Sequence, residues 1–244
     1  MQPKSLRTLL AEPINRRQGW LHSISDRIRL ARAIASAVLY MHIWGFVHKN
    51  IQPENIIIFE CATRSQATNG KWPYVIGTPF LVGYDGVRQA TAESKRLQTS
   101  EWRQRIYLAP GRLNMTDNGK FHMRHDVYSL GVVLLETVFW KNFTDDRSAI
   151  GSKLKSGHNP AKILHDESVQ VSRILGDKYY TAVNACLNEL REEKATHVLD
   201  DQDGIVQGRA YMDQVMRHLE DITVERNTRL PRVLGSTASN SRTS

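Results

Sequence analysis

Residues 48–55 read HKNIQPEN, and this stretch decides how the rest of the sequence is interpreted. A β-branched run, Ile56–Phe59, follows it directly and predicts a short strand. Before it, a helix is predicted, which Ser25 caps and Gly45 ends. Its mostly apolar positions recur at three- and four-residue steps; they are Ile24, Ile28, Ala31, Ala35, Val38 and His42. We therefore expect residues 48–55 to form a loop between a long helix and a strand.

Three further short motifs follow: FLVGYD at 80–85, APG at 109–111 and HDVYSLGV at 125–132. The last of them opens a segment, Asp126–Trp140, that is apolar almost all round and so predicts a helix in the middle of the core. Further helices are predicted over Ala161–Leu175, Lys178–Glu192 and Gly208–Arg226, and strand pieces at Tyr74–Ile76 and Phe80–Tyr84 beside a loop over Thr63–Thr78. The fold class is therefore mainly α with short β-hairpins.

Taken in order, the four motifs resemble the landmarks of protein kinase domains. Residues 48–55 are similar to the catalytic loop, HRDxKPEN in that family; the positions that match are His48, Pro53, Glu54 and Asn55. FLVGYD lies where the family has DFG, APG lies where it has APE, and HDVYSLGV resembles the opening of its long buried helix. The resemblance implies the α+β fold of the large, C-terminal kinase lobe. The wording of the motifs is most similar to kinase-like domains of filamentous fungi, which are often joined to signalling or cell-death modules.

The resemblance implies structural roles for two residues. In kinases the aspartate equivalent to Asp126 anchors the backbone of the catalytic loop and does no chemistry, and we expect the same of Asp126. His48 is expected to pack and hydrogen-bond inside the lobe.

The positions that carry chemistry in the family differ here. Phosphoryl transfer needs a carboxylate that accepts the substrate proton, and charged groups that hold ATP and magnesium. Asn50 stands at the position of the base, and its amide can orient a hydroxyl but cannot accept a proton at neutral pH. Gln52 replaces the lysine two residues on, which removes a cation. No intact catalytic residue is therefore predicted.

The metal-binding positions are altered as well. Gly83 stands where DFG has its aspartate, a register supported by Arg88, because the family often has arginine five positions later. Glycine offers no ligand, although Asn55 could still supply one amide oxygen. A shift of the strand by two residues would instead bring Asp85 to the metal position. Asn55 and Asp85 are thus the candidate nucleotide-binding residues, no metal site is predicted, and ATP with magnesium is expected only if Asp85 takes that place.

Two other kinase features are changed. No GxGxxG motif occurs in the 244 residues, and residues 3–10 resemble the segment just after the hinge between the lobes. We therefore expect a hinge-like segment at 1–24, a large lobe without its small lobe at 25–226, and a disordered tail at 227–244. Gly111 replaces the glutamate of APE that ties the activation segment to the lobe, so this segment is either held differently or loose.

The composition excludes several classes of protein. Hydrophobic residues make up 41% and charged residues 24%, as in soluble globular domains. Cys61 and Cys186 lie far apart, which excludes a disulfide scaffold and a zinc ribbon. The most apolar segment, Val127–Trp140, is shorter than the roughly 20 residues of a membrane span, and the N-terminal residues lack the apolar stretch of a secretory signal. We expect a cytoplasmic or nuclear protein that is not secreted and has no membrane contact.

These observations favour a catalytically degraded kinase-like domain, a pseudokinase that binds a protein partner through the exposed face that a small lobe would cover. The alternative is an unconventional active Ser/Thr protein kinase that uses Asp85 and a small lobe from elsewhere. The net charge of +8 also raises a remote alternative, a basic nucleic-acid-binding protein. No stripe of basic and aromatic residues supports it, so nucleic acid is not an expected partner.

Overall fold

The computed structural model describes residues 3–12, 22–59, 76–84, 88–89, 102–113, 121–190 and 208–222. Several predictions fall outside these ranges and concern residues 63–75, Asp85 and the tail at 227–244. Of the strand predicted at Tyr74–Ile76, only Ile76 is described, and it lies outside any strand.

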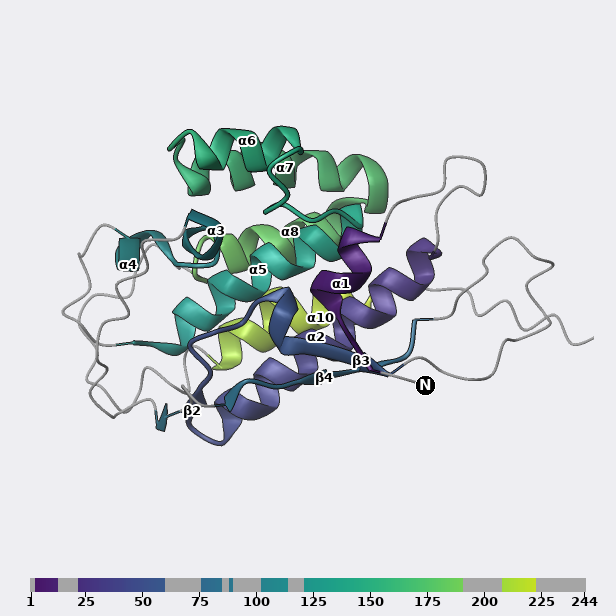
Figure 1. Ribbon diagram of the computed structural model, residues 1–244. Helices are drawn as coiled ribbons and strands as arrows, with labels where there is room; N and C mark the ends of the chain where they lie inside the picture. Colours follow the sequence, from purple (N-terminus) through teal and green to yellow (C-terminus); the bar gives the residue numbers. More distant parts are fainter. Residues whose placement is uncertain are drawn as a thin grey trace, which may run out of the picture.

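Helices dominate the described part of the chain (Figure 1). They are α1 (Leu6–Ala11), α2 (Ile24–Ile43), α3 (Trp102–Arg105), α4 (Pro110–Leu113), α5 (Met123–Phe139), α6 (Ala149–Lys155), α7 (Pro160–Leu175), α8 (Asp177–Leu187) and α10 (Arg217–Glu220), with a 3₁₀ turn η1 (Pro53–Asn55) and a π-helical turn η4 (Met212–Met216). None of the described helices is both long and apolar enough to cross a membrane.

Helix α5 lies at the centre of the core, as its all-round apolar sequence predicts. It packs against α2 on one side and against α8 on the other (Figure 1). Close approach to α8 depends on Gly131, because a Cβ at this position would lie 2.8 Å from the Cβ of Cys186. The hydroxyl of Tyr179 donates to the carbonyl of Leu134 over 3.0 Å and joins the same two helices. The core is therefore built around α5.

Two small antiparallel sheets complete the fold. In one sheet the order is β1 (Lys4–Ser5), β3 (Ile56–Phe59), β4 (Thr78–Leu81), and in the other β2 (Phe46–Val47) pairs with β5 (Arg88–Gln89). Ile56 pairs with Leu81, so the end of β4 lies beside the residue that follows the HKNIQPEN loop. The prediction of a mainly helical fold with short antiparallel pieces is confirmed.

Two helix ends differ from the sequence-based expectation. The N-cap of α2 is Ser23 rather than Ser25: its backbone is extended and its hydroxyl accepts from the N–H of Asp26 over 3.0 Å. Ser25 already belongs to the first helical turn, where a side chain cannot cap. Helix α8 ends at Leu187 rather than Glu192, and the chain then turns through left-handed backbone angles at Glu189 and Leu190.

One strand is also displaced from its predicted position. The strand expected at Phe80–Tyr84 is β4, at Thr78–Leu81. The N–H of Val82 donates to the carbonyl of Asn55 over 2.8 Å, and Gly83 then has φ 85°, which an extended strand cannot contain. The strand therefore stops before the residues that the kinase resemblance identifies with DFG.

Candidate functional site

The HKNIQPEN loop runs from β2 to β3, and a residue in the first turn of α5 holds its backbone. Asp126, which is fully buried, accepts hydrogen bonds from the backbone N–H groups of His48 (2.6 Å) and Lys49 (2.8 Å). The Nε2 of His42 lies 3.3 Å from the same carboxylate. The backbone of Lys49 has φ 70°, a left-handed conformation that residues other than glycine rarely adopt. One carboxylate thus fixes the sharp bend of the loop.

His48 fills the space between the loop and β4. Its Nε2 lies 3.0 Å from the carbonyl of Val82, its Nδ1 accepts from the N–H of Asn50, and its ring packs against Tyr84 with centroids 5.3 Å apart. Burial lowers the pKa of the His48 imidazole, although the charge of Asp126 opposes this. A neutral imidazole with its proton on Nε2 fits both hydrogen bonds, so His48 works as a packing residue in this geometry.

Asn50, Gln52 and Asn55 lie on the open side of the loop. The side chain of Asn50 is exposed, and Gln52 is half-buried. The Nδ2 of Asn55 donates to the carbonyl of Asn50 over 2.8 Å, which braces the loop. These three side chains are all neutral amides.

Gly83 lies directly against the amide of Asn55. A Cβ built on Gly83 would lie 2.8 Å from both the Cγ and the Oδ1 of Asn55, closer than real Cβ contacts. The structure therefore brings together Asn55 and Gly83, the two positions that the kinase resemblance assigns to metal binding. It leaves no room for a side chain at position 83 unless Asn55 moves. Asp85, the competing candidate, lies outside the described residues.

The described side chains at this place do not fit a magnesium ion. Protein sites for magnesium use one or two carboxylates together with phosphate oxygens. Asp126 uses both of its oxygens on the loop backbone, and Glu54 binds Arg7. Among the described residues, no three His, Cys, Asp or Glu side chains are grouped closely enough to hold a metal ion.

A buried charged network lies beneath the loop, and sequence reasoning missed it. Arg7 of α1 donates to Glu136 of α5 over 2.8 Å and to Glu54 of η1 over 2.8 Å. Burial opposes the charge of Arg7, but Glu136 and the other partners outweigh it and raise the arginine pKa above its usual range. Burial raises the pKa of the Glu136 carboxyl, against the opposing effect of Arg7. Glu136 carried a signal in the sequence, because an acid within a largely apolar, buried stretch of helix requires a partner.

Tyr107 connects this network to the segment that contains the APG motif. Its hydroxyl donates to Glu136 over 2.6 Å and accepts from Arg7. The hydroxyl of Ser129 on α5 donates to the Tyr107 carbonyl over 2.7 Å. The end of the segment at Tyr107 is therefore held against α1 and α5.

Large apolar side chains are exposed on or beside the elements that flank the loop; we call this set of residues the exposed apolar face. Its members are Tyr40, Ile43, Trp44, Phe46, Phe59, Phe80 and Tyr84. Trp44 is 77% exposed and Tyr40 is 64% exposed. The rings of Phe59 and Phe80 meet edge to face with centroids 5.2 Å apart. Single exposed apolar residues are ordinary, whereas a contiguous apolar patch is typical of an interaction surface.

The comparison with protein-family models agrees with the fold and with this loop. The model of the protein kinase domain matches residues 1–207, which include α1, the HKNIQPEN loop, Gly83 and α5. The chain therefore belongs to the protein kinase domain family.

Proposed function

We propose that this kinase-like domain is catalytically degraded and acts as a protein-interaction module in signalling. The observation that carries the proposal is the contact between Gly83 and Asn55. At the place where the family holds magnesium, bare backbone lies against a neutral amide. A carboxylate at position 83 would displace Asn55.

The groups for proton and charge transfer are replaced as well. Asn50 has no basic site at neutral pH, and the loss of a general base reduces the rate by about 10²–10⁴-fold. Gln52 supplies no positive charge for a transferring phosphate. Because the described residues do not fit magnesium, we expect neither tight binding of magnesium–ATP nor phosphoryl transfer.

The exposed apolar face is the proposed binding surface for a protein partner. Its residues lie on or beside α2, β2, β3 and β4, which flank the loop, and the resemblance to kinases implies that a small lobe would cover this side. Trp and Tyr dominate binding hot spots because they remove much apolar area from water at a small cost in side-chain entropy. Tyr40 lies in the last turn of α2 and Trp44 is its C-cap. These two aromatic residues are the expected anchors for the partner.

A phosphotransfer assay tests the catalytic part of the proposal. The full chain is incubated with radiolabelled ATP, a generic protein substrate and either magnesium or manganese, and the Asp85→Ala variant serves as the control. We expect equal incorporation at background level for both proteins. Transfer by the wild-type chain that is lost in Asp85→Ala would instead establish an active kinase that uses Asp85.

Site-specific photocrosslinking in cells tests the binding part. Photoreactive p-benzoylphenylalanine replaces Trp44, or, as a matched control, Arg173, which is exposed on α7 far from the loop. We expect a discrete protein adduct from position 44 that position 173 does not give. Identical adduct patterns, or none at position 44, would contradict the proposed binding face.

A further inference from the structure

His48 is a fully buried titratable residue whose side chain joins two segments of the chain. Its Nδ1 accepts from the N–H of Asn50 over 3.3 Å, and its Nε2 lies 3.0 Å from the carbonyl of Val82, which follows β4. Its ring also packs against the ring of Tyr84, with centroids 5.3 Å apart. The imidazole therefore connects the HKNIQPEN loop to the residues on both sides of Gly83.

The two hydrogen bonds of the imidazole are compatible with only one of its protonation states. A carbonyl needs a donor and a backbone N–H needs an acceptor, so Nε2 carries the proton and Nδ1 carries none. A second proton, on Nδ1, turns this acceptor into a donor that faces the N–H of Asn50. A charged His48 therefore cannot keep the bond to Asn50, and the observed conformation of the loop requires a neutral ring.

Charged and titratable groups face His48 from two helices. Asp126 of α5 accepts from the backbone N–H of His48 over 2.6 Å, and the Nε2 of His42 on α2 lies 3.3 Å from the same carboxylate. The neighbouring Lys49 places its Nζ over the ring of Phe121, and the strands β2 and β4 contain no titratable residue. Burial is the largest influence on the imidazole and lowers its pKa, although Asp126 favours the charged form.

We propose that His48 is an acid-sensitive switch for the conformation of the HKNIQPEN loop. In acid, Nδ1 gains a proton from water, the bond from the N–H of Asn50 is lost, and the loop opens so that the charged ring reaches solvent. Because the imidazole also contacts Val82 and Tyr84, the opening releases the residues that follow β4. Tyr84 belongs to the exposed apolar face, so acid changes that surface as well.

The size of the switch follows from the difference in proton affinity between the two conformations. In an open loop the imidazole has its ordinary pKa of about 6.5, whereas burial in the observed conformation lowers the pKa. The observed conformation is therefore favoured above about pH 6.5, and opening increases as the pH falls below that value. Between pH 8 and pH 5 the opening equilibrium shifts by up to about 30-fold.

Hydrogen exchange of the full chain, followed by mass spectrometry, tests the switch. Protection factors are corrected for the intrinsic exchange rate at each pH and compared at pH 8 and pH 5 for peptides covering 48–55, 78–84 and 127–139. We expect protection of the first two to fall by about 5-fold to 30-fold in acid, while the core helix at 127–139 keeps its protection. Unchanged protection of 48–55 would overturn the proposal. An equal loss at 127–139 would also overturn it, because the whole domain would then be unfolding.

Two variants identify the responsible group. His48→Phe keeps a ring beside Tyr84 but removes both nitrogens, and His42→Gln removes the other imidazole near Asp126. We expect His48→Phe to have lower protection at pH 8 and to change less than about 2-fold toward pH 5, whereas His42→Gln should keep the acid response. A response that persists in His48→Phe, or that disappears in His42→Gln, would contradict the assignment.

A measurement on the wild-type chain keeps the proposal testable even if His48→Phe does not fold. Long-range proton–nitrogen NMR spectra at pH 7.5 should show His48 as a neutral ring with its proton on Nε2. A charged ring, or a proton on Nδ1, would overturn the proposal. Because all of these measurements use the chain without a partner, their outcome is independent of the proposed partner binding.

Discussion

The buried side and the open side of the HKNIQPEN loop differ in which residues of the kinase family they keep. On the buried side, Asp126 holds the backbone of His48 and Lys49 with short, charge-assisted hydrogen bonds. On the open side, Asn50 and Gly83 offer no charge. The buried contacts stabilise the fold whether or not any reaction occurs, because breaking them leaves buried polar groups unsatisfied. A well-formed catalytic loop is therefore evidence for the fold, and activity must be judged from the open side alone.

The largest expected effect is on the buried network that supports the loop. Arg7→Met leaves Glu136 buried without its cation and should lower the free energy of unfolding by about 3–5 kcal/mol. Urea denaturation followed by circular dichroism measures the change. The double variant Arg7→Met/Glu136→Leu should recover part of the loss, because it removes the unpaired charge. A double variant as unstable as the sum of the single variants would show that the two residues do not interact.

The same variant should depend on pH in a defined direction. Burial already raises the pKa of Glu136, and removing Arg7 raises it further. A carboxyl whose pKa is higher in the folded state binds more protons there than in the unfolded state, so its contribution favours folding at low pH and is lost as pH rises. The deficit of Arg7→Met relative to wild type should therefore shrink between pH 8 and pH 5. An equal or growing deficit in that range would contradict the account.

Asp126→Asn removes part of the hydrogen bonding on the buried side of the loop. The amide keeps the shape of the side chain but can accept with only one oxygen, so one of the two loop N–H groups loses its partner. We expect a loss of about 1–3 kcal/mol in the free energy of unfolding. Amide hydrogen exchange at His48 and Lys49 should accelerate, and unchanged protection at both amides would contradict the anchoring role.

Gly83→Ala tests the close contact on the open side. Gly83 has φ 85°, and the new Cβ would press against Asn55, so we expect a loss of about 1–2 kcal/mol. Gly45 also has a positive φ but has open space around its Cα, so Gly45→Ala serves as the control for backbone strain alone. Thermal melts of both variants separate the two contributions. Equal losses would show that the contact with Asn55 is unimportant.

The smallest effects are expected at the open amides. Asn50→Ala and Gln52→Ala should change the free energy of unfolding by no more than about 0.5 kcal/mol, because neither side chain is buried. The contrast with Asp126→Asn is the sharpest form of the comparison. If Asn50→Ala lowered the free energy of unfolding as much as Asp126→Asn, the open side of the loop would also stabilise the fold.

Much of the fold follows from sequence, because periodic apolar residues determine which helix faces are buried. Helices α2 and α5 lie within a few residues of their predicted ranges. The order of the kinase motifs along the chain also indicated which residues correspond to the catalytic loop, to DFG and to the start of the buried helix. Errors occurred at element ends, where a single hydrogen bond or a left-handed residue decides the boundary, as with Ser23 and Gly83.

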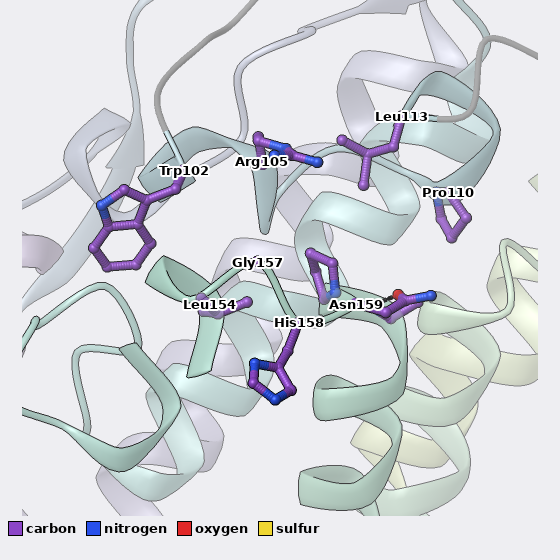
Figure 2. A pocket seen from close by; sticks show the side chains of 10 residues that line it. Trp102, Arg105, Pro110, Leu113, Leu154, Gly157, His158 and Asn159 are labelled. Carbon is purple, nitrogen blue, oxygen red and sulfur yellow. Dashed lines mark hydrogen bonds between the residues drawn. The ribbon is translucent and has the colours of Figure 1, made fainter. Parts of the chain in front are cut away.

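The charged network could not be placed from sequence alone. Arg7 and Glu136 are separated by 129 residues, and no local pattern links them. Tyr107 has an ordinary sequence context, and its partners become clear only when Arg7 of α1 and Glu136 of α5 are brought to it by the fold. A cavity of about 260 Å³ is likewise formed by segments distant in the chain, because its lining residues lie between positions 102 and 113 and between positions 154 and 161 (Figure 2).

Nucleotide binding by the purified full chain tests the central claim most directly. A thermal-shift series with ATP is recorded with and without magnesium, since any ligand that binds only the folded state raises the melting temperature. We predict no magnesium-dependent change in the melting temperature at millimolar ATP. A saturable rise that requires magnesium would show that a carboxylate reaches the place beside Asn55, and it would contradict the account.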